Sequence, residues 1–203
     1  MRIILVTGGV RAGKSRWAER EATRLAGDDV AFVATAEAGD DEMARRIAAH
    51  RAERSTEWTT VEAPIRVPRA VRDAGSPVVI LDCLTLWVSN LLVRDRGAEE
   101  REDRIGVETG PGGREEADLG DGILRRVEAL LEVARRRGGT LIVVTNEVGL
   151  GVVPDNRLAR TYRDLLGWAN ARVAREAERV VLLVAGIPVV IRDDAPPGAP
   201  NVT

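Results

Sequence analysis

The sequence predicts an α/β fold in which a mostly parallel sheet has helices on both faces. Short continuous runs of apolar, β-branched residues are typical of strands buried on both sides. Segments with helical periodicity separate these runs, and this alternation indicates parallel strands joined by helical crossovers. The predicted strands lie at 2–7, 30–34, 58–62, 78–82, 140–145 and 180–184.

Turn and capping residues set the limits of the predicted helices. Asp40 and Asp41 can cap the second helix, Pro64 precedes the third, and Gly138 closes the fifth. Gly186 and Pro188 then turn the chain into a last apolar run, 189–191, which predicts a terminal hairpin. The predicted helices lie at 16–26, 42–54, 65–73, 85–93, 123–137 and 157–178.

Residues 1–192 are predicted to form a single domain. The segment 96–122 is rich in glycine and charge and nearly lacks large apolar residues, so we expect an exposed, mobile insertion there. A functional lid is the alternative for this segment. The tail, 193–203, contains three prolines and is expected to be disordered.

The composition excludes several classes of protein. The chain has 203 residues, a formal net charge of −2 and one cysteine. This balance argues against nucleic-acid or anionic membrane binding and favours small-molecule chemistry. No apolar run reaches the ~20 residues of a membrane span. Met1 leads straight into the first strand, so we expect no signal peptide and a cytoplasmic protein.

The glycine-rich turn between the first strand and the first helix matches G-x-x-x-x-G-K-S/T, the P-loop of nucleoside triphosphate-binding proteins. Its backbone N–H groups and the helix N-terminus bind phosphate oxygens. Lys14 is expected to reach the β- and γ-phosphates, and the Ser15 hydroxyl to bind Mg²⁺. The predicted loop consists of Gly8, Gly9, Val10, Arg11, Ala12, Gly13, Lys14 and Ser15.

Asp82 and His50 are the candidates for chemistry. Asp82 ends a buried strand, where a carboxylate beside a P-loop can hold Mg²⁺; the alternative is a helix cap. His50, the single histidine, shares a predicted helix face with Met43, Ile47 and Arg54. It could be a core residue, or a nucleophile toward phosphorus. The arginines around it could pair with a triphosphate or form a solvated face.

A second polar cluster follows the strand at 140–145. Arg157, Arg160 and Asp164 fall on one helix face, and structural salt bridges there are as well supported as a functional role. The cluster consists of Glu147, Asn156, Arg157, Arg160, Arg163 and Asp164.

Several motifs together resemble the bifunctional adenosylcobinamide kinase/adenosylcobinamide-phosphate guanylyltransferase family of cobalamin biosynthesis. They cover most of the chain outside 96–122 and the tail. The matching stretches are T-G-G-x-R-x-G-K-S at 7–15, V-A-T-A at 33–36, D-D-E-M-x-x-R-I-x-x-H at 40–50, W-x-T-V-E at 58–62, L-D-C-L-T-L-W-V-S-N at 81–90 and T-N-E-V-G-x-G-V-V-P-x-N-R-x-A-R-x-Y-R-D at 145–164.

The resemblance implies a RecA-like sheet order, a homotrimer and two reactions. A nucleoside triphosphate, ATP or GTP, would phosphorylate adenosylcobinamide; GMP from GTP would then pass to adenosylcobinamide phosphate through a guanylyl-histidine at His50. Beyond the loop, the implied nucleotide contacts are Ala34, Thr35, Ala36, Arg51, Ala52, Glu53, Arg54, Glu62 and Asp82. A single-function P-loop kinase and a nucleotide-dependent switch protein are the alternatives.

Overall fold

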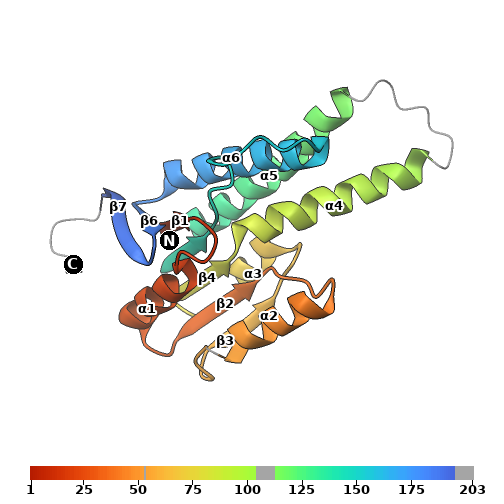
Figure 1. The fold of residues 1–203 in the computed structure, drawn as a ribbon. Helices are drawn as coiled ribbons and strands as arrows, with labels where there is room; N and C mark the ends of the chain where they lie inside the picture. Colours follow the sequence, from red (N-terminus) through yellow and green to blue (C-terminus); the bar gives the residue numbers. More distant parts are fainter. Residues whose placement is uncertain (53, 104–112, 195–203) are drawn as a thin grey trace.

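The computed structural model describes residues 1–52, 54–103 and 113–194. In this part of the chain, one sheet has the strand order β3-β2-β4-β5-β1-β6-β7 (Figure 1). All neighbouring strands are parallel except β6 and β7, which form an antiparallel hairpin. The predicted parallel sheet and terminal hairpin are therefore confirmed. The strands are β1 (Arg2–Gly8), β2 (Val30–Ala34), β3 (Thr59–Glu62), β4 (Val78–Asp82), β5 (Thr140–Val144), β6 (Arg179–Val184) and β7 (Ile187–Asp193).

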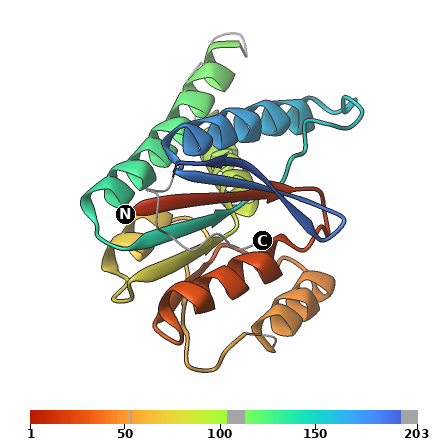
Figure 2. The same cartoon turned by 90° about the vertical axis from the view of Figure 1, so that its left-hand side faces the viewer.

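The helices cover both faces of this sheet, as predicted. Helix α1 packs on one face through Trp17, Ala18 and Ala22, and α2 lies on the same side (Figure 2). Helices α3 to α6 pack on the other face. No helix in the described segments is long and apolar enough to span a membrane. The helices are α1 (Lys14–Ala26), α2 (Asp41–Ala52), α3 (Val67–Asp73), α4 (Leu84–Asp103), α5 (Gly113–Arg136) and α6 (Arg157–Glu176).

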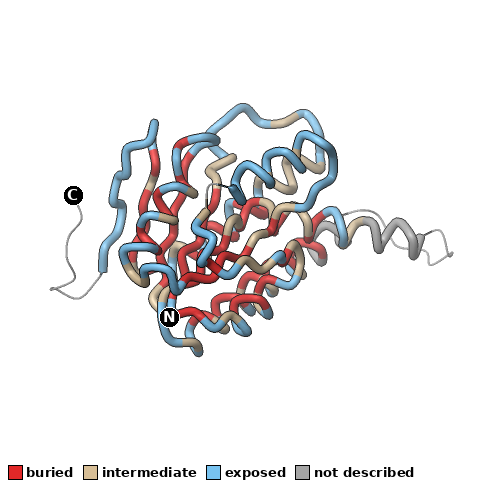
Figure 3. Tube along the Cα trace, turned by 90° about the horizontal axis from the view of Figure 1, so that it is seen from below, coloured by how far each residue is buried: buried red, intermediate tan, exposed pale blue. Residues whose placement is uncertain are grey.

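Alternation along β1 divides the core into two layers. Ile4 and Val6 face α1, whereas Ile3 and Leu5 face the α3–α6 side. Side chains of a strand point alternately to its two faces, so a strand between two helical layers must be apolar throughout. Figure 3 shows the resulting buried segments running through the middle of the molecule.

The prediction for 96–122 is corrected at both ends of the segment. Helix α4 continues to Asp103, and α5 already begins at Gly113. Leu119, Ile123 and Val127 recur at helical spacing and are buried, so their packing outweighs the poor helix propensity of the glycines. Residues 104–112 lie outside the described part.

The prediction of a disordered tail at 193–203 is also corrected at its first residues. Asp193 ends β7, and the backbone N–H of Asp194 donates to Glu178. The remaining residues, 195–203, lie outside the described part.

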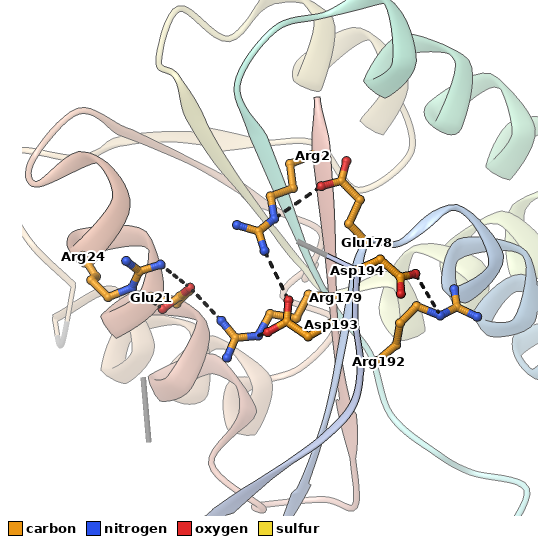
Figure 4. A network of polar contacts seen from close by, with 8 residues as sticks. All are labelled: Arg2, Glu21, Arg24, Glu178, Arg179, Arg192, Asp193 and Asp194. Carbon is orange, nitrogen blue, oxygen red and sulfur yellow. Dashed lines mark hydrogen bonds and ion pairs between the residues drawn. The ribbon is translucent and has the colours of Figure 1, made fainter. Parts of the chain in front are cut away.

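A network of ion pairs fixes the C-terminal hairpin to the start of the chain (Figure 4). Arg179 on β6 lies between Glu21 of α1, at 3.4 Å, and Asp193 of β7, at 3.5 Å. Arg2 of β1 reaches Asp193 at 3.6 Å. The Arg179 and Glu21 side chains are both buried, and each has a second partner, Asp193 for Arg179 and Arg24, at 2.8 Å, for Glu21. The network therefore holds α1 in register with β1 and the hairpin.

Candidate active site

The loop 8–15 joins β1 to α1 at the carboxyl edge of the sheet, where ligands of parallel α/β proteins bind. Gly8 has φ +144°, and a Cβ there would lie 2.4 Å from the carbonyl oxygen of Leu183. Gly13 has φ +90° and precedes α1, which begins at Lys14, two residues earlier than predicted. The N–H of Gly186, in the hairpin turn, donates to Ala12 at 3.2 Å. Gly8 and Gly13 are therefore needed for the backbone path of the loop.

Lys14 is folded back onto the loop. Its Nζ donates to the carbonyl oxygen of Gly9 at 2.7 Å, and the side chain is largely buried. Desolvation lowers the pKa of Lys14, while the negative charge of Asp82 acts in the opposite direction. A desolvated ammonium group at this position is suited to bind a phosphate.

Asp82 lies across β5 from the loop, because β5 separates β4 from β1. Ser15 Oγ donates to its Oδ1 at 3.4 Å. Desolvation raises the pKa of Asp82, opposed by the positive charges of Arg54 and Lys14 and by the hydrogen bond from Ser15. The contact with Ser15 brings two oxygen donors together, which is the ligand type that Mg²⁺ prefers. In the described segments no three His, Cys, Asp or Glu residues form a metal-binding group.

Hydrogen bonds of Thr35 connect the turn at 34–36 to Cys83, the residue after β4. Thr35 Oγ1 donates to the carbonyl oxygen of Cys83 and accepts from the Cys83 N–H, both at 2.8 Å. The carbonyl oxygen of Thr35 accepts from Asn90 Nδ2. The Thr35 hydroxyl is thus used within the fold, and any nucleotide contact of this turn must come from other atoms.

His50 is exposed near the end of α2, so its interpretation as a core residue is wrong. Met43 and Ile47 on the same helix are half-buried, and none of the residues of α2 is fully buried. Arg54, shortly after the end of α2, lies over Phe32 of β2, which pairs with the strand of Asp82, so the end of α2 that carries His50 is near that strand. A solvent-accessible imidazole is available for chemistry.

The residues after His50 lie close to the sheet. Arg51 forms an exposed ion pair with Glu62 at 3.8 Å, and Ala52 ends α2. The guanidinium of Arg54 lies 3.5 Å from the centre of the Phe32 ring, and desolvation lowers the pKa of Arg54. Glu53 lies outside the described residues.

The second polar cluster separates into two groups. Asn156 caps α6, and Arg160 donates to the carbonyl oxygens of Pro154 and Asp155. Glu147 instead joins a buried network with Thr7 and Asn170. Asn170 was not predicted, although a polar residue between the apolar positions Leu166, Ala169 and Val173 of one helix is a recognisable signal.

A P-loop at the carboxyl edge of a parallel sheet, with one strand between β1 and the strand of Asp82, defines the class of P-loop nucleotide-binding enzymes. Residues 4–191 match the family model described as cobinamide kinase / cobinamide phosphate guanyltransferase. The chain belongs to this family of nucleotide-using transferases.

Named relatives agree with this assignment. The chain is 40% identical over 193 residues to the bifunctional adenosylcobalamin biosynthesis protein CobP of Pseudomonas aeruginosa, covering 94% of this chain and 97% of the relative. Identity to CobU of Escherichia coli is 39%, over 94% of this chain and 99% of the relative. An ATPase from a bacterial type III secretion system has a similar fold, with TM-score 0.52 and 15% identity over 90% of this chain and 52% of that one.

Proposed function

We propose that this protein phosphorylates adenosylcobinamide and then transfers GMP from GTP to the product, adenosylcobinamide phosphate. The observation that carries the proposal is the exposed position of the single histidine, His50, on a helix beside the Asp82 end of the phosphate-binding edge. Family membership supports both reactions. The product would be adenosyl-GDP-cobinamide.

In the kinase step, a hydroxyl of adenosylcobinamide attacks the γ-phosphorus of ATP or GTP, and the nucleoside diphosphate leaves. The N–H groups of loop 8–15 and the Lys14 ammonium bind the phosphate oxygens on which charge accumulates. Such groups accelerate the reaction by positioning and by electrostatic stabilisation.

In the transferase step, neutral His50 attacks the α-phosphorus of GTP and pyrophosphate leaves. The resulting phosphoramidate then loses its GMP to a phosphate oxygen of adenosylcobinamide phosphate, which restores the free imidazole. Arg51 and Arg54 follow His50 toward the sheet, where they contact Glu62 and Phe32, and we assign them to phosphate oxygens. Ala34, Ala36, Ala52, Glu53 and Glu62 complete the proposed nucleotide site.

Ser15 and Asp82 fit a Mg²⁺ ion. They supply one hydroxyl and one carboxylate oxygen, and this cation is typically held by one or two carboxylates together with substrate phosphates. When bound, Mg²⁺ would neutralise the negative charge of the triphosphate. We also propose a homotrimer, on the family resemblance alone.

The experiment is an intact-mass measurement after incubation with GTP and Mg²⁺. We expect the wild-type protein to gain one GMP, and His50→Ala to gain none and to lose at least about 100-fold in guanylyl transfer. Glu42→Gln, an exposed change on the same helix, is the matched control and should keep the adduct.

Absence of the adduct in the wild-type protein would refute the guanylyl-histidine. If phosphorylation of adenosylcobinamide then persisted, a single-function kinase would be the correct description. An adduct that persisted in His50→Ala would assign the nucleophile to another residue.

A further inference from the structure

Glu147 follows β5, the strand that lies between the strand of the phosphate loop, β1, and the strand of Asp82, β4. The backbone N–H of Glu147 donates to the carbonyl oxygen of Gly8, the first residue of the loop, at 3.3 Å. The carboxyl ends of parallel strands meet at one edge of the sheet. Glu147 is therefore hydrogen-bonded directly to the phosphate-binding loop. It follows the strand that lies between β1, which leads into the loop, and β4, which carries Asp82.

Two buried donors hold the Glu147 side chain. Thr7 Oγ1 donates to Glu147 Oε1 at 2.8 Å, and Asn170 Nδ2 donates to the same oxygen at 3.3 Å. Thr7 and Asn170 are 5% and 7% exposed. Because both bonds reach Oε1, the orientation of the carboxylate is fixed while neither donor occupies Oε2.

The donors are themselves held by further buried groups. Thr145 Oγ1 donates to Asn170 Oδ1 at 2.7 Å, and Asn170 Nδ2 also donates to the carbonyl oxygen of Asn146 at 3.0 Å. The N–H of Asn146 donates to Thr85 Oγ1 at 2.8 Å. Side chains from β1, α4, the end of β5 and α6 thus position one carboxylate, which is the arrangement expected of a preorganised functional group.

Salt bridging does not explain this carboxylate. Among the side chains that the structure describes, no Lys or Arg forms an ion pair with Glu147. Its side-chain partners are a hydroxyl and an amide, and neither is a cation. A carboxylate in this state can accept a proton from a substrate hydroxyl.

The location also separates Glu147 from His50. Thr7 continues the alternation of Ile3 and Leu5, so its side chain and the bound Glu147 lie toward the α3–α6 side of the sheet edge. Helix α2, with His50, lies on the α1 side (Figure 2). Glu147 can thus approach the terminal phosphate from the side opposite His50.

We infer that Glu147 is the general base of the kinase step; this rests on the function proposed above. Oε2 takes the proton of the adenosylcobinamide hydroxyl as the hydroxyl oxygen bonds to the γ-phosphorus of the nucleotide. The bond from the γ-phosphorus to the β–γ bridging oxygen breaks, and the nucleoside diphosphate leaves with that electron pair. Thr7 and Asn170 are positioning residues that hold Oε1.

The test uses Glu147→Gln in the full-length protein, because the glutamine oxygen can still accept from Thr7 and Asn170. Total phosphorylated corrinoid is measured by chromatography, and guanylylation of His50 by intact mass. We expect kcat for phosphorylation to fall about 100-fold or more, with guanylyl-histidine formation within about twofold of wild type. Glu132→Gln on the exposed surface of α5 is the charge-matched control and should change neither.

A pH profile distinguishes a base from a structural residue. The wild-type phosphorylation rate should fall at low pH as the base becomes protonated, and this limb should be absent in Glu147→Gln. Glu147→Asp, which keeps a carboxylate, should keep the limb at a reduced rate.

Three results would overturn the inference. They are phosphorylation by Glu147→Gln within about threefold of wild type, an equal loss of both half-reactions, and a low-pH limb that persists in the glutamine variant. A wild-type protein that forms no phosphorylated corrinoid would instead refute the proposed kinase function.

Discussion

Lys14 and Asp82 are two ionisable residues whose side chains are poorly solvated. Desolvation lowers the pKa of the lysine and raises the pKa of the aspartate, so burial disfavours the charged form of each. A bound metal at Asp82 and a bound phosphate at Lys14 would add opposite charge beside each group. If Lys14 and Asp82 bind these ligands as proposed, their burial is a cost in the stability of the free protein.

The variant Asp82→Asn tests this cost. The folded-state pKa of Asp82 lies above its unfolded value, so the stability that its protonation contributes at low pH is lost as the pH rises through the folded pKa. At pH 8 without nucleotide, Asp82→Asn should therefore raise Tm, by about 2–4 °C for each kcal/mol of penalty removed.

Thermal unfolding at several pH values measures this effect. The gain in Tm should shrink as the pH approaches the ordinary range of carboxyl groups. Activity should fall about 100-fold or more, because charge stabilisation by a metal is worth several kcal/mol. A lower Tm of the variant at every pH would show that Asp82 stabilises the free protein instead.

Helix α2 differs from the other helices in how it is attached. None of its residues is fully buried, whereas α1 buries Trp17, Ala18 and Ala22 against the sheet. Most helical stability in proteins comes from packing of an apolar face. The element that carries His50 is therefore held mainly by the half-buried Met43 and Ile47 and by Arg54 on Phe32.

Hydrogen exchange can test this weak attachment. In the free protein, the amides of α2 should exchange at least about tenfold faster than those of α1, because local opening costs less where little apolar area is buried. GTP with Mg²⁺ should slow exchange in α2 as His50, Arg51 and Arg54 bind phosphates. Exchange in α2 as slow as in α1 without nucleotide would contradict this account.

At the scale of the molecule, one phosphate loop is placed between two different sets of side chains. Arg54 lies over Phe32 on the α1 side of the sheet, whereas Glu147 is bound to Thr7 on the α3–α6 side. The α- and γ-phosphorus atoms of a nucleotide lie at different positions along it. One acceptor can therefore react with each of them, from opposite sides of the loop. This arrangement offers a physical reason for two transfer reactions in one fold.

If the two sides act separately, the defective variants should complement each other. His50→Ala supplies adenosylcobinamide phosphate, and Glu147→Gln guanylylates it. A mixture should therefore convert adenosylcobinamide and GTP to adenosyl-GDP-cobinamide at least about tenfold faster than either variant alone. Chromatography of the corrinoids measures this; no gain on mixing would indicate that the two residues act in one inseparable centre.

The sequence by itself determined the sheet, the loop and the helix of His50. Continuous apolar runs are buried on both faces of a sheet, and the spacing of loop 8–15 between a strand and a helix indicates phosphate binding. Strand β2 and strand β4 were predicted with their observed bounds, 30–34 and 78–82. The extension of α4 and α5 into 96–122 was missed, because glycine content lowers local propensity while burial of Leu119 is decided by packing.

Only the tertiary structure decided which of these residues meet. Thr7, Glu147 and Asn170 are 140 and 23 residues apart along the chain, and strand order and the packing of α6 bring them together. Likewise, exposure of His50 depends on how α2 lies against the sheet, which helical periodicity cannot specify. Local patterns encode the elements, whereas long-range contacts depend on the packing of all elements at once.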